Sequence, residues 1–165
     1  MLKTRSKVAV AVALVMCGAL LLIGAGARDV AASEVNNRDG RLGREFCAAW
    51  TSHDADRVVA LFTKDTFYED VPFSLKATGP ELKGFAQEFF TAVPDVRVEC
   101  TSVEEHGGHG SIEWVFSGTD VGIFKTGKPF SLRAVSVFDT RGGKISRNVD
   151  YYDAATFMRQ VGLLP

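Results

Sequence analysis

The chain has 165 residues, enough for one globular domain but not comfortably for two. It has 19 Lys and Arg against 20 Asp and Glu, and it is 46% hydrophobic and 24% charged, a balance typical of a folded globular protein. No basic stripe or block of like charge is present, which argues against a nucleic-acid partner.

The first 27 residues have the order of a secretory signal peptide. Three basic residues precede a long apolar run, and Ala25-Gly26-Ala27 matches a small-residue cleavage site. Cleavage there predicts an extracytoplasmic protein, secreted or periplasmic, with a remaining formal charge of 16 − 20 = −4. The alternative is an uncleaved membrane anchor, because the stretch from Val8 to Ala27 is about as long as a membrane-spanning helix.

Residues 28–41 form a polar leader, and residues 42–165 are predicted to form one domain that begins with helices. Apolar residues from Leu42 to Trp50 recur with helical spacing and predict the first helix. Asp54 is placed to cap a second, short helix. The residues expected to face inward from this second helix are Val58, Leu61 and Phe62.

The next stretch, TFYEDVPF, is predicted to be a strand that is broken by Pro72. A third helix is expected to open at Pro80 and to stop at Pro94. Four later stretches alternate with period two and predict an antiparallel meander, at 95–105, 111–119, 128–139 and 144–152. Asp153 is placed to cap a final short helix. This order predicts an α+β domain with helices packed on one face of a curved sheet.

Cys47 and Cys100 are the cysteines that remain beyond the predicted signal segment. In an oxidising compartment they could pair, or they could be two small buried hydrophobic residues, and the sequence leaves both alternatives open. The three histidines and the cysteines lack the spacing of a metal site, and no phosphate loop or nucleotide fingerprint is present. We therefore predict no metal and no cofactor.

Three stretches resemble the SnoaL-like polyketide cyclases of the nuclear transport factor 2-like superfamily. The segment HDADRVVALFTKDTFYEDV resembles the family's second helix and first strand. The segment FSGTDVGIFKTGKPFSLRAVSVF resembles its G-T-x-x-G … T-G-K hairpin, and GKISRNVDYYDAATFMRQVGLL resembles its C-terminal strand and tail. The resemblance runs from Leu42 to the end of the chain. It implies the cone-shaped NTF2-like fold, in which N-terminal helices pack on a curved antiparallel sheet and a short helix ends the chain.

The resemblance assigns a role to two aspartates. In SnoaL-like cyclases the aspartate on the last strand points into the cone and acts as general acid or base, and Asp150 stands at the matching place. Burial among apolar walls would raise its pKa toward a useful pH. In the related ketosteroid isomerases the base lies just after the second helix, where this chain has Asp70. The alternatives are that Asp150 only ends a strand and that Asp70 faces solvent.

Other positions depart from the patterns of the related enzymes. The tyrosine that donates to the oxyanion in the isomerases falls at Phe46, and its acidic partner falls at Ser136. A missing oxyanion donor costs about 3–4 kcal/mol, which argues against isomerisation by that machinery. Cyclases also tend to have a polar residue at the position of Ala134. Arg133 is expected on the face opposite Ser136, so the Asp-Arg-Asp trio of the epoxide hydrolases is not matched.

We therefore expect an exported protein that binds a small apolar carbonyl compound and carries out cofactor-free cyclisation or isomerisation through Asp150 and Asp70. The alternative is a non-catalytic module that binds a hydrophobic ligand. The residues expected to surround the ligand are Phe46, Trp50, Tyr68, Phe90, Trp114 and Ser136. A homodimer is expected through the outer sheet face near Arg133, Val135 and Val137, and no membrane contact is expected beyond the alternative N-terminal anchor.

Overall fold

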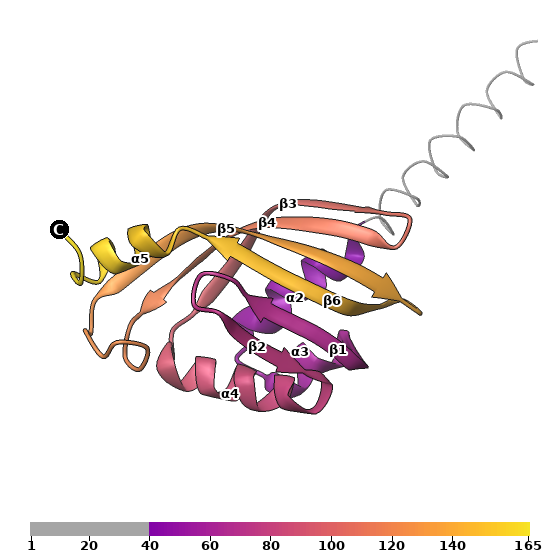
Figure 1. Ribbon diagram of the computed structural model, residues 1–165, viewed down its shortest axis with the longest axis horizontal. Coiled ribbons are helices and arrows are strands. Elements are labelled where there is room, and N and C mark those ends of the chain that lie inside the picture. The colour runs from indigo at the N-terminus through magenta and orange to yellow at the C-terminus, as the bar shows by residue number, and fades with distance from the viewer. Residues whose placement is uncertain (1–39) are drawn as a thin grey trace, which may run out of the picture. The chain divides into compact units, whose positions relative to one another are not determined.

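A computed structural model describes residues 40–165, which form a curved six-stranded sheet with helices against it (Figure 1). The predicted signal segment and residues 28–39 of the leader lie outside the described residues. Within residues 40–165 no helix has the length and apolar character needed to cross a membrane. The α+β class predicted from the sequence is confirmed.

The first two helices form where the apolar spacing placed them. Helix α2, Arg41–Thr51, buries the face that carries Phe46 and Trp50. Helix α3, Ala55–Ala60, is capped by Asp54, whose carboxylate accepts hydrogen bonds from the backbone N–H groups of the first turn at 2.9 and 3.2 Å. The prediction that Phe62 belongs to this helix is wrong, because α3 ends at Ala60 and Phe62 begins the first strand.

The remaining elements follow in the order strand, strand, helix, four strands and helix. Their bounds are β1 Phe62–Asp70, β2 Leu75–Thr78, the 3-10 turn η1 Gly79–Glu81, α4 Leu82–Ala92, β3 Arg97–His106, β4 His109–Thr119, β5 Pro129–Arg141, β6 Lys144–Tyr152 and α5 Ala154–Gln160. The strand order in the sheet is β2-β1-β6-β5-β4-β3. Helix α2 packs along β3, α3 packs against α4, and α5 packs against β5.

The sheet differs from the predicted meander at one edge. Strand β1 pairs with β6 in parallel, whereas all other neighbours are antiparallel. The sequence analysis also missed β2, which returns along β1 after a turn that contains Pro72. A four-residue edge strand is too short to show a clear alternating pattern, and strand direction depends on which strands become neighbours.

The strand register brings even-numbered residues to one face of the sheet. Asp70 pairs with Asp150 across β1 and β6, Ser136 pairs with Asp150 across β5 and β6, and Trp114 pairs with Ala134 across β4 and β5. Because register partners point to the same face and side chains alternate along a strand, these side chains share the concave, helix-covered face. On the outer face Val137 and Tyr151 are exposed.

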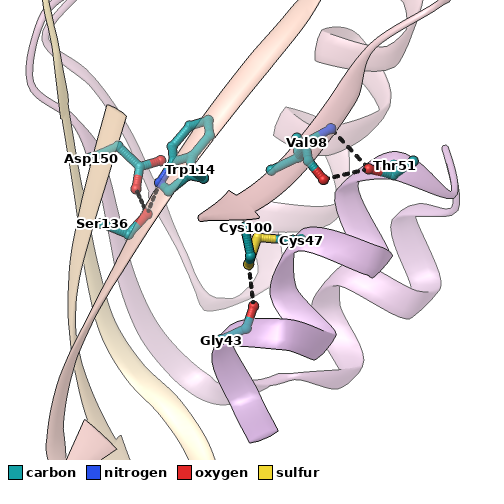
Figure 2. Close-up of a disulfide and its surroundings, with 8 residues drawn as sticks. All are labelled: Gly43, Cys47, Thr51, Val98, Cys100, Trp114, Ser136 and Asp150. Carbon is teal, nitrogen blue, oxygen red and sulfur yellow. Dashed lines mark hydrogen bonds between the residues drawn. A yellow bond between two sulfur atoms is a disulfide. The ribbon is translucent and has the colours of Figure 1, made fainter. Parts of the chain in front are cut away.

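A disulfide bond joins helix α2 to strand β3. Cys47 and Cys100 are paired, with their Cα atoms 5.9 Å apart, so the structure resolves the alternative that the sequence left open (Figure 2). The Thr51 hydroxyl on the same helix donates to the carbonyl oxygen of Val98 at 3.0 Å and accepts from its N–H at 2.9 Å. Helix α2 is therefore fixed to β3 by one covalent bond and two hydrogen bonds.

Loss of the disulfide is expected to destabilise the domain without changing its fold. The bond closes a loop across a sequence separation of 53 residues, so its removal should lower the free energy of unfolding by about 4 kcal/mol through the added freedom of the unfolded chain. Denaturant unfolding of the Cys47→Ala/Cys100→Ala variant measures this. A reductant should destabilise the native protein by a similar amount and leave the variant unchanged. Equal stability of the two proteins would contradict the expectation.

Candidate active site

Asp150 lies at the centre of a buried hydrogen-bond network on the concave face. Only 2% of its surface is exposed. Its Oδ1 accepts from the Ser136 hydroxyl at 2.5 Å and from the Asn148 amide at 2.7 Å, and its Oδ2 accepts from the Tyr68 hydroxyl. Trp114 Nε1 in turn donates to Ser136 Oγ at 2.9 Å, so the chain of donors reaches β4 (Figure 2).

The environment of Asp150 raises the pKa of its carboxyl group from 3.8 to about 6. Burial is the main cause, because it disfavours the charged form, and the three side-chain donors oppose it by stabilising the carboxylate. The nearby charge of Asp70 adds a smaller upward effect. A carboxyl group with a pKa near 6 can both hold and release a proton close to neutral pH.

Asp70 and Tyr152 form a second polar pair beside this network. Tyr152 OH donates to Asp70 Oδ2 at 2.7 Å, and the N–H of Phe73 donates to Asp70 Oδ1 at 3.1 Å. Burial raises the pKa of Asp70, although both hydrogen bonds act in the opposite direction. The pKa of the Tyr152 phenol is also raised, first by burial and then by the charge of Asp70, so this hydroxyl stays a donor.

Two cavities open on this face, and Asp70 and Tyr152 line both. The inner one measures about 50 Å³ and contacts Asp150, whereas the outer one measures about 570 Å³ and does not. The inner cavity has room for a few water molecules and not for an organic ligand. Of the two cavities, the outer one has the size of a pocket for an organic ligand, and Asp70 and Tyr152 are among the residues that line it.

Four of the six residues expected to surround the ligand line the inner cavity, namely Phe46, Trp50, Tyr68 and Trp114. Ser136 lies beneath them and is completely buried. Phe90 lines neither cavity, because its ring packs on Trp50 at 5.7 Å and stacks on His53 at 5.4 Å. The predicted aromatic residues of α2, β1 and β4 therefore form part of the wall of the inner cavity.

Trp50 lines the inner cavity and also carries a buried polar group without a partner. Its indole Nε1 is buried and has no hydrogen-bond partner among the described residues. A buried donor without a partner is uncommon in folded proteins. The Ser136 hydroxyl, in contrast, already donates to Asp150.

The hairpin from Asp120 to Lys128 forms part of the rim of the outer cavity. Asp120 is fully buried, and its carboxylate accepts from the N–H groups of Phe124, Lys125 and Thr126 at 3.0 to 3.3 Å. Gly122 lies so close to α4 that an added Cβ would fall 2.6 Å from the Cα of Ala92. These contacts explain why Gly and Thr residues occur at their positions in this segment. They also place Phe124 at the cavity.

The sequence analysis missed several residues of the outer cavity and the second polar pair. Tyr152 and Asn148 lie two residues to either side of Asp150 on β6, so the period of the strand could have placed both on the same face. Phe85 and Phe89 of α4 and the hairpin residues Ile123 and Phe124 also line the outer cavity. No local pattern indicates that the helix and the hairpin meet at one opening.

Neither cavity contains the side chains of an epoxide hydrolase trio or of a metal site. Arg133 is exposed on the outer face, and no arginine lines either cavity. Among residues 40–165 no three His, Cys, Asp or Glu side chains lie close enough together to hold a metal ion. The titratable groups at the cavities are therefore carboxyl and phenol groups.

Solved structures with the same fold support the architecture. A protein of ketosteroid isomerase-like fold from Catenulispora acidiphila, solved in complex with trimethylamine, is 28% identical with a TM-score of 0.70, covering 77% of this chain and 95% of its own. A putative polyketide cyclase from Bacillus cereus is 22% identical with a TM-score of 0.63, covering 75% and 80%. An epoxide hydrolase of the LEH-like type from M. tuberculosis is 19% identical with a TM-score of 0.63, covering 76% and 90%.

The fold is thus that of the ketosteroid isomerase-like, or NTF2-like, proteins. Residues 41–161 match the model of the SnoaL-like polyketide cyclases, and the chain belongs to that family. The resemblance drawn from the sequence is confirmed.

Replacing Asp150 with Asn should change how stability depends on pH. Because the folded-state pKa of about 6 lies above the ordinary 3.8, the stability that comes from protonated Asp150 is present below about pH 4 and is lost as the pH rises through about 6. From pH 4 to pH 7 the native protein should lose about 2 kcal/mol relative to Asp150→Asn. Denaturant unfolding at each pH measures the difference. If the free energy of unfolding of the two proteins changed with pH in the same way, the carboxyl group of Asp150 would have no raised pKa.

Proposed function

We propose that this protein binds a small apolar carbonyl compound in the outer cavity and moves protons on it with Asp70, supported by Tyr152 and Asp150. The observation that carries the proposal is the position of Asp70, a half-buried carboxyl group with a raised pKa that lines both cavities. Membership of the SnoaL-like cyclase family supports the same reaction class.

The chemistry follows from the protonation states of the pair. Asp70 in its charged form takes a proton from the carbon next to the carbonyl group, and the electron pair of the broken C–H bond becomes an enolate. The enolate then regains a proton at another carbon, which is isomerisation, or its carbon forms a bond to a second carbonyl group, which closes a ring. In the second case Asp70 returns its proton to the new alkoxide. Neither route changes the oxidation state of the ligand as a whole.

The enolate oxygen needs a hydrogen-bond donor, and Tyr152 OH, which lines both cavities, is placed to serve. Its one proton is donated to Asp70, so it becomes free for the enolate oxygen once Asp70 has taken up the proton of the ligand. A donor that is already oriented in a water-poor site acts strongly. Tyr152 would replace the donors that the resemblance placed at Phe46, which has no hydroxyl group, and at Ser136, which is committed to Asp150.

In our proposal, Asp150 influences the pair formed by Asp70 and Tyr152 without contacting the ligand. It is the register partner of Asp70 on the parallel strands β1 and β6, and each charge raises the free energy of the other. Protonated Asp150 therefore favours charged Asp70. The small inner cavity between them has room for water that could carry a proton from one carboxyl group to the other.

The alternative function is a non-catalytic module that binds a hydrophobic ligand. One observation favours it: the carboxylate of Asp150 is saturated by three side-chain donors and has no contact with the outer cavity. The complex of the Catenulispora acidiphila protein with trimethylamine is consistent with small-molecule binding in that relative. Binding without proton transfer would identify this alternative.

We also propose that the protein works outside the cytoplasm. The disulfide between Cys47 and Cys100 supports this location, since such bonds persist in oxidising compartments. The signal-like order of residues 1–27 supports it independently.

Asp70→Asn should slow proton exchange on a ketone by about 100-fold or more, because the variant lacks the base. The probe is 2-tetralone in D₂O, with loss of the α-proton signal followed by NMR. The rate of the native protein should rise with pH as Asp70 loses its proton, with a midpoint above the ordinary Asp value.

Asp65→Asn is the matched control for this assay, because Asp65 lies on the same strand, is exposed and does not line either cavity. The control should exchange protons at the native rate. A native protein that binds 2-tetralone and leaves its α-protons in place would refute the catalytic proposal and favour the binding module.

Export should leave a protein that begins at Arg28. Expression of the full chain in a secreting bacterial host, followed by intact-mass measurement of the extracytoplasmic fraction, tests cleavage after Ala27. Replacing Ala27 with Arg should block processing there. A full-length mass confined to the membrane fraction would instead identify an uncleaved anchor.

A further inference from the structure

The wall of the outer cavity combines aromatic rings with negative charge. Of the 13 side chains that line it, seven are Phe or Tyr, two are the acids Asp70 and Glu88, and none is Lys, Arg or His. The proposed proton transfer gives Asp70 a role with a neutral ligand, but such a ligand gains nothing from Glu88. The composition therefore points to a feature of the ligand that a neutral hydrocarbon or ketone lacks.

The acids at the two cavities have no positive partner within the described chain. None of the ion pairs formed by residues 40–165 includes Asp70, Asp150 or Glu88. Asp70 and Asp150 are close enough that the charge of one raises the pKa of the other. Low-dielectric walls strengthen a field of one sign, so the cavity attracts cations. A positive group in the ligand would offset the cost of burying the carboxylates of Asp70 and Asp150.

The rings are oriented in several directions around the opening. The ring of Phe73 lies 5.9 Å from those of Phe124 and Phe157 and 6.1 Å from that of Tyr152, with angles of 53 to 80° between the planes. The rings therefore form a wall of differently oriented aromatic groups beside the two acids. Aromatic rings attract tertiary and quaternary ammonium groups through cation–π interactions.

We propose that the ligand of the outer cavity carries a tertiary or quaternary ammonium group beside its apolar body, recognised by Asp70, Glu88 and the aromatic wall around Phe73. This inference rests on the proposed function, since it names the ligand class of the same cavity. The acids attract and partly neutralise the cation, and the rings provide its first contact shell. The remaining volume of the cavity, about 570 Å³ in all, holds the apolar body.

Two probes of equal shape test the charge requirement. Phenyltrimethylammonium and tert-butylbenzene differ in the replacement of a positively charged nitrogen by carbon. The purified protein should bind the ammonium compound about tenfold more tightly or better, as measured by amide chemical-shift titration. Added salt should weaken binding of the ammonium compound only.

Three variants separate the two sources of recognition. Glu88→Gln, an exposed position on α4, should weaken binding of phenyltrimethylammonium several-fold and leave tert-butylbenzene unchanged. Phe73→Leu should reduce the preference for the cation while keeping an apolar wall. Phe67→Leu is its matched control, because Phe67 lies on the other face of β1, beneath Lys76, and should leave the preference intact.

The outcomes are decisive for the ligand class and distinguishable from those of the proton-transfer assay. Equal affinity for the two probes, or no binding of either, overturns the inference of a cationic ligand. The exchange of 2-tetralone protons is measured separately, so the proposed catalysis stands if that exchange depends on Asp70 and falls if it does not. A preference for the cation that survives Glu88→Gln, Phe73→Leu and Asp70→Asn also overturns the inference, because the charge would then be recognised elsewhere.

Discussion

The buried carboxyl group of Asp150 is the constraint around which the concave face of the sheet is arranged. A carboxylate removed from water is costly unless hydrogen bonds replace the lost solvent. Here the replacement comes from Tyr68 on β1, Ser136 on β5 and Asn148 on β6, with Trp114 on β4 supporting Ser136. Four neighbouring strands thus meet at one acid. This network specifies the register of the strands, as apolar packing also does. If one strand slipped by one residue along its neighbour, its side chains that now face the network would turn to the outer face.

The same network gives the two acids on this face different surroundings. Both oxygens of Asp150 are engaged, and the inner cavity that it lines is too small for an organic molecule. Asp70 accepts one hydrogen bond on each oxygen and also faces the larger cavity. Two nearby carboxyl groups with raised pKa values do not both carry a charge without cost, so the state of Asp150 influences that of Asp70. Under the proposed function, the protonation of the buried acid would thereby influence that of the accessible one.

Sequence reasoning reached most of the fold because the local signals agree. The Asp54 cap, the helical spacing from Leu42 and the alternation in the last four strands are each local, and each element formed. The parallel pairing of β1 with β6 was not predictable in this way, because it joins segments about 80 residues apart. The importance of Asp150 and Asp70 came from the family resemblance. Their separation into an inner and an outer cavity depends on how Phe85, Phe89 and the 120–128 hairpin pack, which no single segment encodes.

The disulfide links the stability of the fold to the geometry of the inner cavity. Cys47 is next to Phe46 on α2, and Cys100 is the strand partner of Trp114 across β3 and β4. The bond therefore joins α2, which carries Phe46, to the strand that pairs with β4, which carries Trp114. The rings of Phe46 and Trp114 lie 6.3 Å apart, and both line the inner cavity. Since Trp114 also holds Ser136 against Asp150, movement of α2 away from β3 would open the inner cavity to water, reduce the burial of Asp150 and lower its pKa. Oxidative closure of this bond is thus part of what keeps the carboxyl group in its apolar surroundings.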